Sequence, residues 1–307
     1  MRWQTEVEIS PLKNRIQYKD KVLFVGSCFA NEIGSIMKSL RFNVLVNPFG
    51  VLFNPWSVTD SLLRVESAYP FTEDDVIQTG DLYKSFSLGS GFAALSRVEF
   101  LAKSNAILAE ASAHFKECRW VLVTLGTSRV YREKNRGVIV SNCHKLPDSQ
   151  FERFSMGPEE IADIMSPVIE RNPQKNWIFT VSPVRHLRDG ANGNQLSKAR
   201  LLLAVEILQK RFNNLNYFPS YEIFIDQLRD YRFYATDMVH PSADSLSFVW
   251  ELFMKYAVDS SCNERIKQIS SLNALKSHRP LFPESNDYKN LLEKIAILER
   301  NIANDKI

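Results

Sequence analysis

The chain has 307 residues, enough to bury one large hydrophobic core, and 45% hydrophobic with 24% charged residues is an ordinary globular composition. Its net charge of +3 is small and no basic run stands out, so neither a nucleic-acid nor a membrane-surface partner is expected. No segment approaches the roughly 20 apolar residues that cross a bilayer, and the polar N-terminus lacks the apolar stretch of a signal peptide. The four cysteines are widely spaced without a CxxC pair, which argues against a disulfide framework or a zinc site. A cytoplasmic protein is therefore expected.

Five short segments are apolar nearly throughout, a pattern typical of buried parallel strands. Helical periodicity separates them, with Pro158 opening one helix and Ser197 predicted to cap another. In chain order the predicted strands are 22–25, 42–46, 120–125, 177–181 and 221–225, and the predicted helices are 31–40, 99–115, 159–170 and 198–212. This alternation predicts an α/β fold, a three-layer α/β/α sandwich around a five-stranded parallel sheet.

Two segments depart from this rhythm. Residues 129–140 have strand-like ends around Asn135-Arg136-Gly137, which predicts an inserted β-hairpin at about 129–145. Beyond residue 257 the chain becomes polar and ends in a helical stripe of Leu291, Ile295, Leu298 and Ile302. The expected division is a catalytic-type domain at 1–257 and a helical extension at 258–307. The stripe is expected to be buried on its own domain or on a second copy of the chain, as a homodimer.

The segment Val22 to Glu32 contains Gly26-Ser27-Cys28-Phe29-Ala30 and predicts a strand, a tight turn and a helix. Gly26 permits a sharp turn, and the helix N-terminus that follows offers free backbone N–H groups to an oxyanion. The helix dipole also lowers a thiol pKa, so Cys28 is expected to be partly thiolate near neutral pH. Taken alone, a cysteine here is more often a small buried hydrophobe.

The second chemical motif is Asp237-Met238-Val239-His240-Pro241, which follows the last predicted strand. An aspartate three residues before a histidine can orient the imidazole through the ring nitrogen that faces away from a nucleophile. Ser242 is placed to cap the next helix. The motif is weak alone, but its position predicts that it lies at the same sheet edge as the Gly26 turn.

The order of these motifs resembles that of the SGNH/GDSL hydrolases, and the spelling GSCFA resembles the GSCFA family, a bacterial branch of that superfold. The likeness covers most of the chain, including segments 142–145, 182–186 and 231–235. Matching the GDSL motif to Gly26-Ser27-Cys28-Phe29 implies that Cys28 is the nucleophile, with Ser27 as the second choice. Matching the glycine-threonine-asparagine motif to Gly126-Thr127-Ser128 implies that Ser128 replaces the oxyanion-hole asparagine, with Gly50 as the glycine donor.

Other residues near the predicted sheet edge are candidates for substrate contact. His186 follows the fourth strand, and Arg185 and Arg188 flank it, where they could hold a carboxylate or phosphate of the substrate or simply lie on a surface loop. Thr127 and His144 are further candidates, although Cys143-His144 is as well explained by packing under the hairpin. No metal ion or cofactor is expected.

The leading hypothesis is an esterase or thioesterase acting on a small-molecule or carbohydrate ester. His240, oriented by Asp237, takes the proton from Cys28 or Ser27, and an acyl-enzyme forms. An O-acyltransferase with the same residues, or a non-catalytic member that binds a ligand in the old cleft, are the alternatives.

Overall fold

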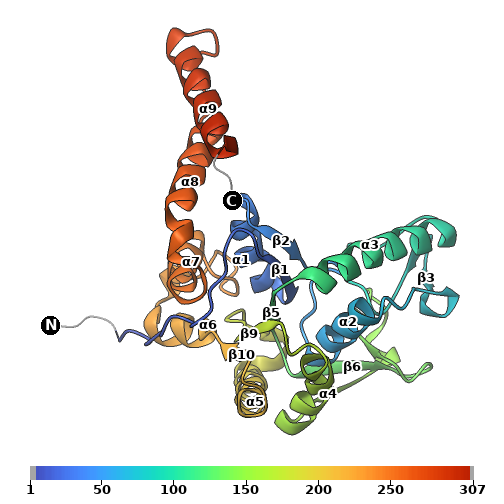
Figure 1. Cartoon of the computed structure of the whole chain (residues 1–307). Helices are drawn as coiled ribbons and strands as arrows, with labels where there is room; N and C mark the ends of the chain where they lie inside the picture. The colour runs from blue at the N-terminus through green and yellow to red at the C-terminus, as the bar shows by residue number, and fades with distance from the viewer. Residues whose placement is uncertain (1–4, 305–307) are drawn as a thin grey trace.

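The computed structural model describes residues 5–304 (Figure 1). Its centre is a five-stranded, wholly parallel sheet in the order β10–β9–β5–β1–β2. The strands are β1 (Lys21–Gly26), β2 (Asn43–Val46), β5 (Trp120–Leu125), β9 (Asn176–Val181) and β10 (Leu215–Tyr217). The predicted α/β class and five-stranded parallel sheet are confirmed.

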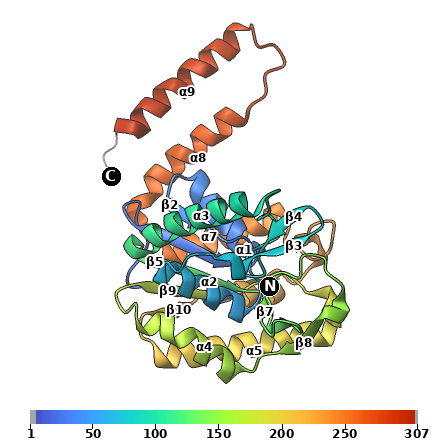
Figure 2. The ribbon, with the colours of Figure 1, turned by 90° about the vertical axis from the view of Figure 1, so that its right-hand side faces the viewer.

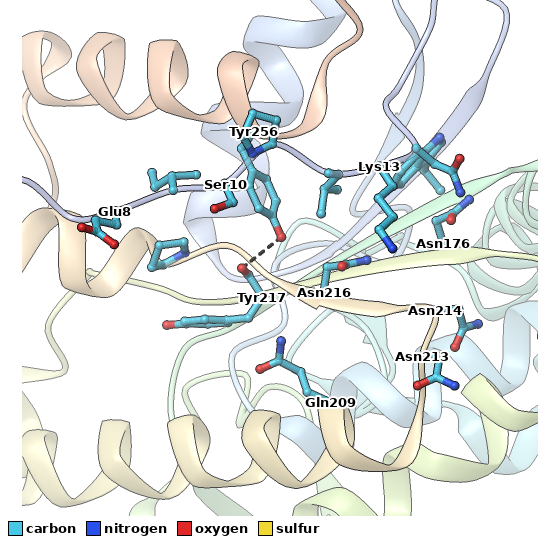
Figure 3. Close-up of a pocket in the computed structure, with 16 residues that line it drawn as sticks. Glu8, Ser10, Lys13, Asn176, Gln209, Asn213, Asn214, Asn216, Tyr217 and Tyr256 are labelled. Atoms are coloured by element: carbon cyan, nitrogen blue, oxygen red, sulfur yellow. Dashed lines mark hydrogen bonds between the residues drawn. The ribbon is translucent and has the colours of Figure 1, made fainter.

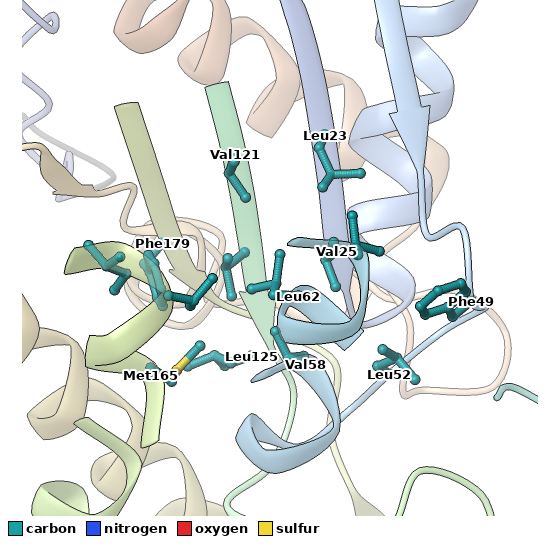
Figure 4. Close-up of a cluster of buried hydrophobic side chains, with 14 of the residues drawn as sticks. Leu23, Val25, Phe49, Leu52, Val58, Leu62, Val121, Leu125, Met165 and Phe179 are labelled. Atoms are coloured by element: carbon teal, nitrogen blue, oxygen red, sulfur yellow. The ribbon is translucent and has the colours of Figure 1, made fainter. Parts of the chain in front are cut away.

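Helices cover both faces of this sheet, because the inner strands are apolar on both sides. Leu23, Val121 and Phe179 point to one face and belong to one core cluster with Leu62 and Met165 (Figure 4). Val22, Leu122 and Ile178 alternate with them and point to the other face. The first face carries α2 (Pro55–Ser67), α3 (Arg97–Glu117), α4 (Pro158–Glu170) and α5 (Gly190–Arg211), and the second carries α1 (Cys28–Ser39) and α7 (Ala243–Ala257).

The fifth predicted strand, at 221–225, is wrong. That segment forms the short helix α6 (Ser220–Glu222) and a π-helical turn at Ile223–Gln227, while the edge strand β10 lies just before it. Ile223 and Phe224 are buried in the second core, so the run is apolar without being extended. A short apolar run cannot by its pattern distinguish a buried strand from a buried helical turn.

Helix α5 begins eight residues before its predicted start, and Ser197 is therefore not its N-cap. The segment 190–194 contains two glycines and reads as a loop. Tertiary contacts nevertheless hold it in the helix, since Asn194 Oδ1 accepts a hydrogen bond from the His186 backbone N–H at 3.0 Å. Ser197 is buried inside the helix, 1% exposed. The cap predicted for Ser242 is confirmed, because its side chain accepts from the Ser245 backbone N–H.

The predicted hairpin is present as β6 (Arg129–Glu133) and β7 (Ile139–Val140), and β8 (Phe151–Ser155) pairs with β6 on its other side. A second small antiparallel pair, β3 (Ile77–Thr79) with β4 (Leu82–Lys84), lies between α2 and α3 in the chain. Single 3₁₀ turns complete the described elements at Glu73–Asp75, Asp148–Gln150, Leu187–Asp189, Tyr231–Phe233 and Ser260–Cys262.

The C-terminal helices α8 (Asn263–Ser277) and α9 (Asn286–Asn304) form a hairpin that projects from the body (Figure 2). Ile302 is 1% exposed, and the other three residues of its stripe are half-buried along α9. The inner part of α8 shares the second core through Ile266, Ile269 and Leu272. Among residues 5–304, no helix is long and apolar enough to cross a membrane.

Candidate active site

The turn between β1 and α1 is fixed by Gly26. Its φ of +139° and its contact with β5 exclude a side chain, because a Cβ there would lie 2.1 Å from the Thr124 carbonyl oxygen. The Gly26 N–H donates to Asn47 Oδ1 at 2.7 Å, and Asn47 Nδ2 donates to Asn31 Oδ1 at 2.6 Å. Asn47 thus ties the loop after β2 to the turn, which explains why that loop begins with an asparagine.

Ser27 and Cys28 leave this turn in different directions. Ser27 is 2% exposed, its N–H donates to the Thr124 carbonyl at 3.0 Å, and its Oγ lies 3.0 Å from Thr124 Oγ1. Its hydroxyl therefore faces β5 and the sheet. Cys28 is the first residue of α1, is half-buried and lines a cleft. Of the two candidate nucleophiles, only Cys28 borders this cleft.

The thiolate expected from the helix dipole is not what this environment favours. Burial raises the pKa of the Cys28 thiol above its ordinary value; a hydrogen bond from the Cys28 backbone N–H opposes this in part, and the nearby Glu32 carboxylate adds a smaller increase. The resting side chain is therefore a thiol. Any chemistry at Cys28 Sγ then needs a base to accept its proton.

The loop at Asp237 and His240 forms a tight unit. Asp237 Oδ2 lies 2.7 Å from His240 Nδ1, and Asp237 Oδ1 accepts from the backbone N–H groups of Val239 and His240 at 2.9 and 3.0 Å. These hydrogen bonds lower the Asp237 pKa to about 2, so its carboxylate is charged at neutral pH. The imidazole is therefore held with Nε2 as its unengaged nitrogen.

Both motifs open into one cleft of about 580 Å³ at the carboxyl ends of the strands. Cys28 and His240 line it together with Thr127, Arg185 and His186. No hydrogen bond joins Cys28 Sγ to His240, a contact that often tightens only when substrate binds. Residues that the sequence analysis did not propose as site residues complete the lining: Phe53, Asn54, Arg129, Tyr131, Val140, Ser141, Asn142, Val184, Leu187, Asp189 and Val239, beside Arg188 and Cys143.

Three residues predicted to face the substrate are not brought to this cleft. Ser128 is fully buried and its Oγ donates to Ser197 Oγ at 3.2 Å. The Gly50 N–H is already donated to the Asn47 carbonyl at 2.8 Å. His144 is 4% exposed with its Nε2 2.7 Å from the Ser85 carbonyl oxygen, so it packs beneath the hairpin. Its neighbour Cys143 lines the cleft in its place.

A buried lysine joins two loops whose following residues, Thr127 and Val184, line the cleft. Lys198 is 1% exposed, and its Nζ donates to the carbonyl oxygens of Gly126 at 2.6 Å and Ser182 at 2.7 Å. It thereby joins the carboxyl ends of β5 and β9. Burial lowers its pKa to about 7, and burial together with the charge of Lys198 lowers the pKa of His186 to about 4. The His186 imidazole is therefore an uncharged part of the cleft wall at pH 7. In the sequence, neither the pattern of polar residues around Lys198 nor its spacing from the other motifs had marked it as a site residue.

Within residues 5–304, no three His, Cys, Asp or Glu side chains cluster so that they could hold a metal ion. All four cysteines are free thiols. The reactive groups in the lining of the cleft are the thiols of Cys28 and Cys143 and the oriented imidazole of His240, beside several N–H donors.

Solved structures to which the chain is similar include two forms of the Geobacillus enzyme Axe2. A mutant described as an acetyl-xylooligosaccharide esterase is 10% identical, with a TM-score of 0.42 over 78% of this chain and 95% of its own. A catalytic mutant described as an acetylxylan esterase from Geobacillus stearothermophilus is 12% identical, with a TM-score of 0.38 over 80% and 99%. This likeness is too distant to bear on the reaction.

No curated protein matches the chain in sequence. The sequence profile of the GSCFA family matches residues 21–253, which include the sheet, the Cys28 turn and the His240 loop. The protein therefore belongs to the GSCFA family.

Proposed function

We propose that this protein is an acyl-ester hydrolase, an esterase or thioesterase, that forms a covalent acyl-enzyme on Cys28. One observation carries the proposal: Cys28 lines the same cleft as His240, whose Nδ1 is held by Asp237 at 2.7 Å. A protein that only bound a ligand would have no need of an oriented imidazole beside a thiol.

In the proposed reaction, His240 Nε2 accepts the proton of the Cys28 thiol as Sγ forms a bond to the carbonyl carbon of the substrate. The tetrahedral intermediate collapses, the ester or thioester bond breaks, and His240 returns the proton to the leaving alcohol or thiol. Water, deprotonated by the same imidazole, then attacks the thioester at Cys28 and releases the acid. Asp237 stabilises the imidazolium at both steps.

An O-acyltransferase would follow the same first half and differ only in its acceptor, a hydroxyl of a second substrate in place of water. The half-open cleft leaves Cys28 accessible, and it holds Tyr131 and Asn142 as polar lining residues. These residues could bind either acceptor, and product analysis distinguishes water from a hydroxyl acceptor.

The test is acylation of the purified chain by 4-nitrophenyl acetate, followed by intact-mass and peptide mapping. We expect one acetyl group on Cys28, a burst of 4-nitrophenol and slower steady release. Product analysis with and without added glycerol or xylose then separates hydrolysis from transfer. A wild-type protein that no aryl ester or thioester acylates would leave only the ligand-binding alternative.

A further inference from the structure

The cleft has more cationic than anionic side chains in its lining. Arg129, Arg185 and Arg188 face it, against one carboxylate, Asp189. Arg129 forms an ion pair with Asp189 at 3.2 Å, and Arg153 forms a second ion pair with the same carboxylate. These pairs cancel the charge of Asp189 within the wall itself.

The three arginines differ in their partners. Arg188 is exposed and pairs with Asp148 outside the lining. Arg185 is half-buried and, within residues 5–304, pairs with no carboxylate. Its guanidinium carbon lies 4.7 Å from the centre of the Tyr234 ring. A guanidinium has five N–H donors, so most of them remain available.

Tyr234 places this charge near the reacting groups. An isolated β-bridge pairs Tyr234 with Pro241, which is the residue directly after His240 in the chain. Stacking on an aromatic ring orients a guanidinium and leaves its edge free for a bidentate acceptor. A half-buried cation without a carboxylate partner is best satisfied by an anionic ligand.

We propose that Arg185 binds a carboxylate or phosphate group of the acyl substrate, so that the protein acts on anionic esters or thioesters. This inference rests on the proposed function, because it assumes that the substrate reacts at Cys28. The anion would form paired N–H hydrogen bonds with Arg185 while the carbonyl group lies between Cys28 and His240.

The test compares esters that differ in one charge. The acyl-side pair is mono-4-nitrophenyl succinate and the 4-nitrophenyl ester of succinamic acid, its neutral isostere. The leaving-group pair is 4-acetoxybenzoate and 4-acetoxybenzamide. In at least one pair we expect the anionic member to have about 10- to 100-fold higher kcat/KM, the size of a charge-assisted hydrogen bond. Arg185→Gln should remove this preference.

Arg232→Gln is the matched control, because Arg232 lies in the segment just before Tyr234, is 74% exposed at its side chain and is outside the cleft. It should keep the preference. Protection of Cys28 from iodoacetamide by inorganic phosphate or by acetate reports anion binding without turnover, and the stronger protector distinguishes a phosphate from a carboxylate substrate. Equal rates within both pairs, with no protection, would overturn the anion site while leaving an active esterase. Protection lost in Arg185→Gln without any ester turnover would instead overturn the proposed function.

A separate observation concerns Asn54, which lines the cleft together with Cys28 and is only 5% exposed. Its Oδ1 accepts from the Ser57 backbone N–H at 2.8 Å and so caps α2. This bond fixes which amide atom is which. Within the described chain no acceptor is bonded to its Nδ2, which lies on the opposite side of the amide.

We infer that Asn54 Nδ2 donates to the substrate oxyanion, beside the Cys28 backbone N–H. Ser128 and Gly50 are engaged elsewhere, so the cleft lacks the donors expected from the superfold. An amide already held by its cap bond needs no reorganisation as negative charge develops on the oxygen.

Asn54→Ser separates the two roles of this residue, since serine also caps a helix but cannot extend a donor as far. We expect acylation of Cys28 to slow about 100- to 1000-fold with KM nearly constant, because the interaction forms mainly in the transition state. Asn54→Ala should slow acylation of Cys28 by the same factor and should also lower Tm. An Asn54→Ser rate within threefold of wild type would show that the residue is a cap alone.

Discussion

Two cavities of similar size lie at opposite ends of the central sheet. The cleft with Cys28 and His240 is about 580 Å³ and lies at the carboxyl ends of the strands. The other, of about 680 Å³, lies where β5 and β9 begin, at Trp120 and Asn176, and is bordered by the edge strand β10 (Figure 3). If volume were the criterion, the second cavity would be taken as the functional site.

Their linings differ in chemistry. The larger cavity has amides around it, including Asn176, Gln209 and Asn216, and a hydrogen bond from Tyr256 Oη to the Tyr217 carbonyl at 3.0 Å crosses its wall (Figure 3). Its lining residues within 5–304 include no cysteine and no histidine. Helices α5 and α7 end near it, whereas α1 and α2 begin at the cleft. Because parallel strands run into helix N-termini at their carboxyl ends, N–H donors and nucleophile turns gather at that edge alone.

The largest expected effect is the loss of acylation when the nucleophile of the cleft is removed. Cys28→Ala should abolish acylation by an electrophilic ester probe, since losing a covalent nucleophile costs several orders of magnitude in rate. Ser27→Ala should keep much of the labelling and lower stability by about 1 kcal/mol, the value of its hydrogen bond to Thr124. The measurement is intact mass after timed labelling. Full labelling of Cys28→Ala with none of Ser27→Ala would make this a serine enzyme.

A smaller loss is expected at the base. His240→Ala should slow acylation by roughly 10²- to 10⁴-fold, because burial raises the Cys28 pKa and the thiol needs an acceptor for its proton. Raising the pH should partly restore the rate in this variant as the thiolate forms unaided. Asp237→Asn should also slow acylation. Stopped-flow rates from pH 6 to 10 test this, and a pH-independent His240→Ala variant would contradict it.

Lys198 should make the free energy of unfolding depend on pH. Its pKa is lowered from 10.5 to about 7 in the fold, so between pH 7 and 10 the unfolded chain binds the extra proton and the folded state gains stability as pH rises. The gain is at most about 1.4 kcal/mol per pH unit. The free energy of unfolding of wild type relative to Lys198→Met should therefore increase from pH 7 to 9. A constant difference in urea titrations would show that Lys198 titrates normally.

The smallest effects on acylation are expected from changes in the larger cavity. Lys13→Ala and Asn216→Ala alter the larger cavity, which lies away from the nucleophile. Both variants should acylate at Cys28 within about twofold of wild type, as surface changes remote from a site usually do. Loss of labelling in either would show that the two ends of the sheet are coupled.

Local sequence pattern identified those features of the protein that depend on neighbours in the chain. The first four strands, the hairpin around Asn135-Arg136-Gly137 and the Ser242 cap each follow from periodicity or turn chemistry within a few residues. The Cys28 turn and the Asp237–His240 pair were also readable, because each motif is contiguous. Their meeting at one sheet edge follows from the parallel order of the strands.

What the sequence left undecided depends on partners far apart in the chain. Ser128 is removed from the cleft by Ser197, 69 residues later. Residues 190–197 are helical through contacts with the β9 loop and in spite of their glycines. Arg185 is singled out only by which carboxylates the other arginines meet, and Asn54 only by the direction in which its cap bond turns the amide. Hydrogen bonds and ion pairs act over about 3 Å, so their assignment requires the distances that tertiary packing creates.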